Sequence, residues 1–239
     1  MDLSYNVVYN DDCFNILPII PDKSIDMVLV DLPYGQTDCH WDIAIDLNKM
    51  WEQLKRICKD NTAICFFTTV KFGNSLINSN PLWFRYDLVM PKSNAVGYLS
   101  ANKMPLRAHE MVYVFYKKLP KYTPQKIQGK PYIAKPQGIN PMYSKNVREI
   151  TINETGLRYP TSIIPLYNRD NCKSNHSTRK SVKTCEWLVR TYSNNNDLVL
   201  DFTCGSGSTL QACKNTNRRY IGIEKDREIY QKCCELLRK

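Results

Sequence analysis

Short apolar runs recur along this chain, and between them lie segments whose apolar positions repeat every three or four residues. The runs predict strands at residues 6–9, 25–30, 63–68, 86–90, 111–116, 198–201 and 220–223. The intervening segments predict helices at residues 13–20, 46–58, 70–78, 178–193, 208–215 and 226–238. Such alternation is typical of a doubly wound α/β fold, with a mostly parallel sheet covered by helices on both faces.

The middle of the chain interrupts this pattern. From Lys117 to about Tyr167 the sequence is rich in Lys, Pro, Gln, Asn and Tyr and shows little periodicity. Low apolar content can indicate disorder. The tyrosines spread through this stretch indicate instead a small irregular module that becomes ordered on a partner.

Length and composition restrict the class of protein. With 239 residues and 43% hydrophobic content, the chain can form one α/β domain with a substantial core. No apolar stretch approaches the roughly 20 residues that span a bilayer, and the N-terminus carries no basic export signal. The ten cysteines include no C-x-x-C pair, and Cys65 and Cys213 fall inside apolar elements. These features predict reduced thiols, a cytoplasmic location and no membrane partner.

Positive charge is concentrated in one region. Residues 91–183 hold 17 Lys and Arg against 4 acidic residues, whereas the rest of the chain holds 16 basic and 19 acidic residues. The net charge of the whole chain is +10, and the excess of basic residues lies in this one region. Such a concentration of positive charge predicts a polyanionic partner.

The first candidate for chemistry is Asp31-Leu32-Pro33-Tyr34, directly after the apolar run 25–30. A carboxylate can accept an N–H of an exocyclic amine, and an aromatic ring can stack on the planar base that carries it. Proline leaves a neighbouring carbonyl able to accept the second N–H. Turns after strands often contain these residue types, so this segment alone leaves an ordinary turn as an equal alternative.

The second candidate follows the strand predicted at 198–201. Gly205 and Gly207 allow a tight turn close to a ligand, and Glu224 ends the next strand about 20 residues later. That arrangement is typical of a nucleotide-type cofactor on a doubly wound sheet, with the acid on its ribose hydroxyls. The pattern lacks a third glycine, which disfavours a dinucleotide.

Together these segments resemble the amino-methylating DNA methyltransferases that use S-adenosylmethionine, in the group where the catalytic D-P-P-Y box precedes the F-x-G-x-G box. The resemblance covers most of the chain and includes three shorter stretches. These are Tyr9–Cys13, which resembles an acidic turn beside the cofactor's adenine; Leu99–Glu110; and His176–Ser181, which resembles an H-P-T-x-K-P box. Leu32 replaces the first proline of the catalytic box, and Ser177 and Ser181 replace both prolines of the later box.

The resemblance implies a Rossmann-like methyltransferase sheet with an irregular target-recognition insertion. It divides the chain into a catalytic half (1–117), a target-recognition region (118–170) and a cofactor-binding half (171–239), and it places 86–90 and 111–116 at an antiparallel edge. The catalytic residues would be Asp31, Leu32, Pro33 and Tyr34. S-adenosylmethionine would be bound by Asp12, Cys13, Asp31, His176, Ser177, Thr178, Lys180, Asp201, Phe202, Thr203, Cys204, Gly205, Ser206, Gly207, Ser208, Thr209, Glu224 and Lys225.

The implied substrate is DNA, methylated on N6 of adenine at a specific short sequence. DNA contacts are expected from Lys92, Asn94, Lys103, Arg107 and His109, although a histidine just before a strand is more often a structural residue. A restriction endonuclease of the same system and a second copy of the chain are further expected partners.

Other functions stay open at this point. An N4-cytosine methyltransferase needs the same amine-binding pocket; an acidic first residue favours adenine, but only by resemblance. Methylation of RNA or of a protein glutamine is disfavoured, because Asn usually replaces Asp31 in those enzymes. A catalytically silent nucleic-acid-binding module would be expected to lose Asp31 or the glycine turn. An NAD-dependent oxidoreductase fits the basic region least well.

Overall fold

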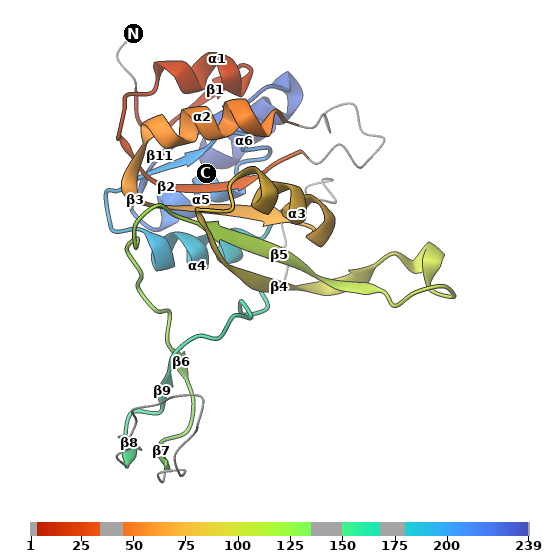
Figure 1. Ribbon diagram of the computed structural model, residues 1–239, viewed down its shortest axis with the longest axis vertical. Coiled ribbons are helices and arrows are strands. Elements are labelled where there is room, and N and C mark those ends of the chain that lie inside the picture. The colour runs from red at the N-terminus through yellow and green to blue at the C-terminus, as the bar shows by residue number, and fades with distance from the viewer. Residues whose placement is uncertain (1–3, 34–44, 135–149, 168–179, 239) are drawn as a thin grey trace. The chain divides into compact units, whose positions relative to one another are not determined.

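The computed structural model describes residues 4–33, 45–134, 150–167 and 180–238 (Figure 1). The chain forms two compact units: one contains residues 1–123 and 162–239, and the other contains residues 124–161. The smaller unit lies inside the segment 118–170 that the sequence assigns to target recognition.

The larger unit is built on a seven-stranded sheet with the strand order β1-β11-β10-β2-β3-β5-β4. From β1 to β3 in this order the neighbouring strands are parallel, whereas β5 is antiparallel to both β3 and β4. The strands are β1 (Val7–Asn10), β2 (Ile25–Asp31), β3 (Cys58–Thr68), β4 (Phe84–Val96), β5 (Arg107–Phe115), β10 (Leu198–Asp201) and β11 (Arg219–Glu224). The predicted mostly parallel sheet with an antiparallel edge is therefore confirmed.

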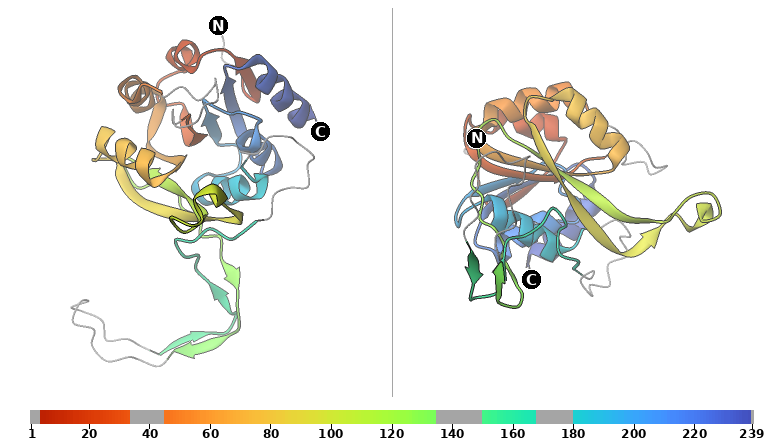
Figure 2. Two further views of the ribbon diagram at one scale, coloured as in Figure 1. Left: turned by 90° about the vertical axis from the view of Figure 1, so that its right-hand side faces the viewer. Right: turned by 60° about the horizontal axis from the view of Figure 1, so that its bottom comes forward.

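Helices cover both faces of this sheet, as the alternating pattern predicts (Figures 1 and 2). One apolar core joins the sheet to α1 (Cys13–Ile16), α2 (Leu47–Ile57) and α3 (Val70–Ser79). A second core joins it to α4 (Val182–Tyr192), α5 (Ser208–Asn215) and α6 (Arg227–Arg238). No helix within the described residues is both long and apolar enough to cross a membrane.

Local chemistry explains where several elements begin and end. Asp46 caps α2 by accepting hydrogen bonds from the backbone N–H groups of Asn48 and Lys49. The helix predicted at 13–20 is divided into α1 and the 3₁₀ helix η1 (Leu17–Ile19), because Pro18 cannot donate the next helical hydrogen bond. The helix predicted from 178 begins at Val182, and residues 178 and 179 lie outside the described part of the chain.

Strands β4 and β5 continue well past the predicted 86–90 and 111–116 and form a projecting hairpin (Figure 1). Pro91 pairs with His109 and Val96 with Arg107, and a 3₁₀ turn, η2 (Tyr98–Ser100), follows Gly97. We call residues 91–109 the arm. Neither apolar core includes a residue of the arm, so its strands lack the alternation of apolar and polar positions that would have revealed them in the sequence.

The smaller unit consists of two short antiparallel ladders. One pairs β6 (Ile127–Gln128) with β9 (Leu157–Arg158), and the other pairs β7 (Tyr132–Ala134) with β8 (Thr151–Asn153). The sequence predicts an irregular module here, since strands of two or three residues are too short to produce a visible alternation. Gly156 has a φ of +72°, and a Cβ there would lie 2.2 Å from the carbonyl oxygen of Gly129, so the turn requires glycine.

Candidate active site

The two sequence motifs meet at one edge of the sheet. Strands β2 and β10 are parallel neighbours, so Asp31 at the end of β2 lies beside the turn that follows Asp201. The Thr203 hydroxyl donates a hydrogen bond of 3.0 Å to the carbonyl oxygen of Asp31, across 172 residues of sequence. The end of β2 and the glycine turn therefore lie together at one edge of the sheet, as the resemblance implies.

A chain of ion pairs holds the Asp31 carboxylate. Lys180 Nζ lies 2.6 Å from Asp31 Oδ2 and 3.2 Å from Glu110 Oε2. Lys92 Nζ lies 2.5 Å from the other oxygen of Glu110. Lys180 also lies over the Phe67 ring, 5.4 Å from its centre. Two acids and two bases from β2, β4, β5 and the segment before α4 thus form one network.

The backbone of the glycine turn is fixed from β11. Cys204 N–H donates to the carbonyl of Ile223, and Gly205 N–H donates to Glu224 Oε2 at 2.9 Å. Gly205 and Gly207 have φ values of +52° and +84°, which favour glycine. A Cβ on Gly207 would lie 2.6 Å from Cys233 Sγ, whereas a Cβ on Gly205 would meet nothing within 4 Å. Gly205 therefore borders open space at the turn.

A buried acid, Asp201, and a half-buried acid, Glu224, lie at this turn. Burial raises the pKa of Asp201 to about 7, although hydrogen bonds from the Thr209 side chain and the Thr203 backbone act in the opposite direction. Burial also raises the pKa of Glu224. The hydrogen bonds that Glu224 accepts from the backbone N–H groups of Asp226 and Gly205 lower this pKa, but burial outweighs them. Both carboxylates are thus positioned by backbone donors at the edge where β10 and β11 end.

A third group extends the site along β1 and β11. Asn10 pairs with Glu224 in register, and its side-chain amide donates to the carbonyls of Glu224 and Lys225. Asp12 caps α1 through the Phe14 N–H and pairs with Lys225 Nζ at 3.0 Å. The structure thus brings Asp12 and its neighbour Cys13 to the same sheet edge as Glu224 and the glycine turn.

The remaining predicted residues are distributed as follows. Leu32, Phe202, Cys204, Ser208 and Thr209 are buried, so they can reach a ligand mainly through backbone atoms. Ser208 Oγ donates to the carbonyl of Lys180, which ties α5 to the segment before α4. Pro33 and Ser206 are half-buried. Tyr34, His176, Ser177 and Thr178 lie outside the described residues.

The predicted DNA contacts all belong to the arm. Asn94, Lys103, Arg107 and His109 are exposed there, while Lys92 is half-buried in the ion pair with Glu110. Sequence reasoning did not assign Glu110 a role in the site. In the sequence, Glu110 is only the last residue of the stretch 99–110 that resembles the family. Its partner Lys180 is far away in the sequence, so no local pattern indicates their ion pair.

These residues fit a nucleotide-type cofactor. Glycine turns with open space beside them allow close approach of a ligand, and an acid ending the following strand suits ribose hydroxyls. Both features are present at Gly205 and Glu224. Within the described residues, no group of three or more His, Cys, Asp or Glu is arranged to hold a metal ion.

Comparison with known proteins identifies the family. The profile of the N6/N4 DNA methylases matches residues 25–235. The type II methyltransferase M.BglII of Bacillus subtilis is 27% identical over 272 residues, covering 97% of this chain and 69% of that protein. M1.MboII of Moraxella bovis, also a type II methyltransferase, is 24% identical over 255 residues. The alignment covers 95% of this chain and 94% of M1.MboII.

Solved structures agree on the fold. The M1.HpyAVI–SAM complex has a TM-score of 0.63 at 20% identity, covering 95% of this chain and 98% of that one. The cytosine-N4-specific PvuII DNA methyltransferase has a TM-score of 0.66 at 14% identity, covering 98% and 93%. The predicted methyltransferase-type fold and the resemblance to amino-methylating enzymes are both confirmed, and this chain belongs to the N6/N4 family of DNA methylases.

Proposed function

We propose that this protein methylates N6 of adenine at a specific short DNA sequence, with S-adenosylmethionine as the methyl donor. The observation that carries the proposal is the position of Asp31, hydrogen-bonded through its backbone to the glycine turn and held by Lys180. An amino group bound by this carboxylate would lie beside the place where a nucleotide-type cofactor fits.

The chain's residues then have distinct tasks. Adenine N6 is a poor nucleophile, because its lone pair is delocalised into the ring. The Asp31 carboxylate accepts one N6 hydrogen and the carbonyl of Leu32 or Pro33 accepts the other, which turns the lone pair out of the ring plane. Such preorganised acceptors are usually the largest electrostatic contribution to catalysis, and alignment adds several kcal/mol.

The cofactor supplies an electron-poor methyl group carried on a sulfonium. Residues Asp201 to Thr209 would hold it, with Glu224 on its ribose and Asp12 near its adenine. His176, Ser177 and Thr178 stay predictions for its methionine end. Lys180 was predicted for the same end, and its contact with Asp31 supports an additional task, which is to orient the catalytic carboxylate.

The choice of adenine over cytosine rests on Asp31. By resemblance, the N4-cytosine enzymes more often carry Ser at this position. Cytosine N4 remains the second candidate, because the same acceptors would bind its amino group equally well. A partner endonuclease and a homodimer remain predictions from the resemblance.

The smaller unit has features that suit DNA recognition. Lys126 stacks over the Tyr159 ring at 4.8 Å and Arg158 over the Tyr132 ring at 5.2 Å. Such pairs present cations and flat apolar surface together, which favours contact with phosphates and bases. We assign target recognition to this unit and to the exposed polar residues of the arm.

Plasmid methylation tests the proposal directly. Plasmid DNA is treated with the protein and labelled S-adenosylmethionine, its nucleosides are analysed, and modified positions are mapped by single-molecule sequencing. We expect N6-methyladenine at one short sequence. N4-methylcytosine would select the second candidate, and unmodified DNA from a protein that binds the cofactor would contradict both.

The variant Asp31→Ala tests the site. Loss of the carboxylate should lower the methylation rate by about 10² or more, while calorimetry should find cofactor binding retained. Asp22→Ala is the matched control, because Asp22 is an exposed acid paired only with Arg56 among the ion pairs of the described residues. Near-normal turnover of Asp31→Ala would contradict the proposed role.

A further inference from the structure

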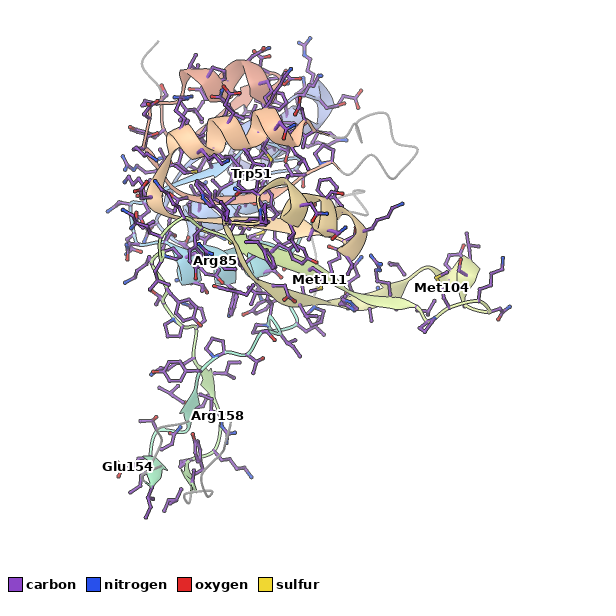
Figure 3. The ribbon with its side chains drawn as sticks, in the orientation of Figure 1. Trp51, Arg85, Met104, Met111, Glu154 and Arg158 are labelled. Carbon is purple, nitrogen blue, oxygen red and sulfur yellow. The ribbon has the colours of Figure 1, made fainter. Side chains whose placement is uncertain are left out.

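The tip of the arm exposes large apolar side chains. Tyr98 is 77% exposed, Leu99 86% and Met104 60%, with Val96 and Leu106 also exposed. Figure 3 places Met104 at the tip and Met111 where the arm joins the sheet. Backbone hydrogen bonds from Ser100 to Gly97 and from Lys103 and Met104 to Ser100 fold the tip into a defined turn. An apolar patch on a projecting, well-formed turn is typical of a binding surface.

The base of the arm is part of the active site. Lys92 on β4 and Glu110 on β5 pair with each other, and Glu110 also pairs with Lys180, which holds Asp31. From Lys92 to Val96 the strand extends about 13 Å at 3.3 Å per residue. With a rise of about 3.4 Å per base pair, the tip can reach a base step up to about four base pairs from a base bound at Asp31.

Charge favours DNA as the partner of this surface. Residues 91–109 contain Lys92, Lys103, Arg107 and His109 but no acidic residue. Apolar side chains flanked by cations suit a duplex, where the cations bind phosphates and the apolar groups meet unstacked bases. A second copy of this chain would bring the same positive charge and a net charge of +10, which opposes contact between two arms.

We propose that the arm tip is a wedge that enters the DNA duplex within about four base pairs of the target base. Tyr98 and Leu99 insert at a base step, and Lys103 and Arg107 bind the flanking phosphates. The wedge weakens stacking around the target, which lowers the free energy needed to flip that base into the site at Asp31. This inference rests on the proposed methylation of DNA and adds the means by which the duplex is opened.

The double variant Tyr98→Ser/Leu99→Ser tests the wedge, because both side chains are exposed and their loss leaves the cores intact. Its matched control is Leu82→Ser, a leucine that is 80% exposed but lies outside the arm. Two duplexes carry the mapped site, one fully paired and one with an abasic position opposite the target, where the base is already loosened.

On the paired duplex, we expect kcat/KM and duplex affinity of the double variant to fall by about tenfold or more. On the abasic duplex the loss of kcat/KM should be less than about threefold, since unstacking there is cheaper. Leu82→Ser should match the wild type on both. Equal losses on the two duplexes, or wild-type behaviour of the double variant, would overturn the wedge.

Two further results separate the alternatives. If sedimentation finds a wild-type dimer that the double variant converts to monomers, the tip is a contact between copies and the proposal is wrong. If the wild type methylates no DNA, the proposed function is wrong. The wedge is then tested by duplex affinity alone, and it is refuted if the double variant binds the duplex as tightly as the wild type. A wild type that is active beside an equally active variant refutes the wedge alone.

Discussion

Lys180 brings a positive charge into a pocket where two carboxylates converge. Burial alone would lower the pKa of Lys180, but the charges of Asp31 and Glu110 raise it above its usual range. Burial alone would raise the pKa of Glu110, but Lys180 and Lys92 outweigh it and hold that pKa below its usual value. All three groups are mostly buried or half-buried, so the network depends on each charge being matched.

Replacing Lys180 should therefore destabilise the fold. Lys180→Met removes the cation that lies between Asp31 and Glu110, while Glu110 keeps its ion pair with Lys92, at a loss of about 3 kcal/mol near neutral pH. Glu110 has a depressed pKa, so its stabilisation is present above about pH 4.3 and is lost as the pH falls through its folded pKa. The difference between wild type and variant in urea unfolding should accordingly shrink in acid. Lys183→Met, at an exposed position of α4, is the control; equal stability of Lys180→Met and wild type at neutral pH would contradict the matched-charge argument.

Asp201 should give the opposite pH dependence. Burial raises its pKa to about 7, so between about pH 4 and 7 the folded state holds a proton that the unfolded chain has lost. Linkage then requires this residue's contribution to fall as pH rises through that window, by up to about 1.4 kcal/mol per pH unit. Asp201→Asn keeps an acceptor for Thr203 but cannot titrate, so its unfolding free energy relative to wild type should rise from about pH 4 to 7 and then level off. A constant difference across this range would exclude the raised pKa.

At the scale of single elements, the glycine turn shows how much the sequence could predict. Strand β10 and helix α5 were predicted with their observed bounds, because the polar residues 194–197 directly precede β10 and Gly207 directly precedes α5. The contacts that make the two glycines unequal were not predictable. They depend on Cys233 of α6, whose approach to Gly207 follows only from the packed fold.

This inequality can be measured. Gly205→Ala should lose only about 1–2 kcal/mol, the strain of a left-handed backbone for a residue with a Cβ. Gly207→Ala should lose more and weaken cofactor binding, because its Cβ would also lie 2.6 Å from Cys233 Sγ. Adding Cys233→Ala to Gly207→Ala removes that sulfur and should recover the steric part of the loss. If the double variant is no more stable than Gly207→Ala, the clash with Cys233 is not the cause.

At the scale of the whole molecule, periodicity predicted the layers of the larger unit, because its strands and helices face apolar cores. The arm was not predicted as a hairpin, although charge and the resemblance at Leu99–Glu110 drew attention to its residues, and the smaller unit was recognised only by composition; neither packs its strands against a core. The ion-pair network that joins four separate elements was invisible for the same reason: ionic contacts between distant residues leave no periodic trace. The sequence therefore predicted the chemistry that we propose at Asp31 and at the glycine turn, while the structure supplied the residues that position them.

Because the larger unit has its own two cores, it should fold without the smaller one. The chain leaves the larger unit after Thr123, whose N–H donates to the carbonyl of Thr191. It returns at Ser162, whose carbonyl accepts a hydrogen bond from the N–H of Val89. Replacing residues 124–161 with a short Gly-Ser linker keeps both hydrogen bonds. We expect the thermal unfolding temperature to change by only a few degrees and cofactor binding by calorimetry to persist.

Site-specific methylation should nevertheless be lost in this deletion. Residues 124–161 contain six Lys and Arg against two acids, so their removal should also flatten the salt dependence of DNA binding, by about 0.9 for each phosphate that the variant no longer neutralises. Lys126→Ala/Arg158→Ala tests the same idea without a deletion, because it removes both cations that stack on Tyr159 and Tyr132. Methylation of the wild-type sequence by the deletion variant would move target recognition to the arm, whereas loss of cofactor binding would mean that the larger unit does not fold alone.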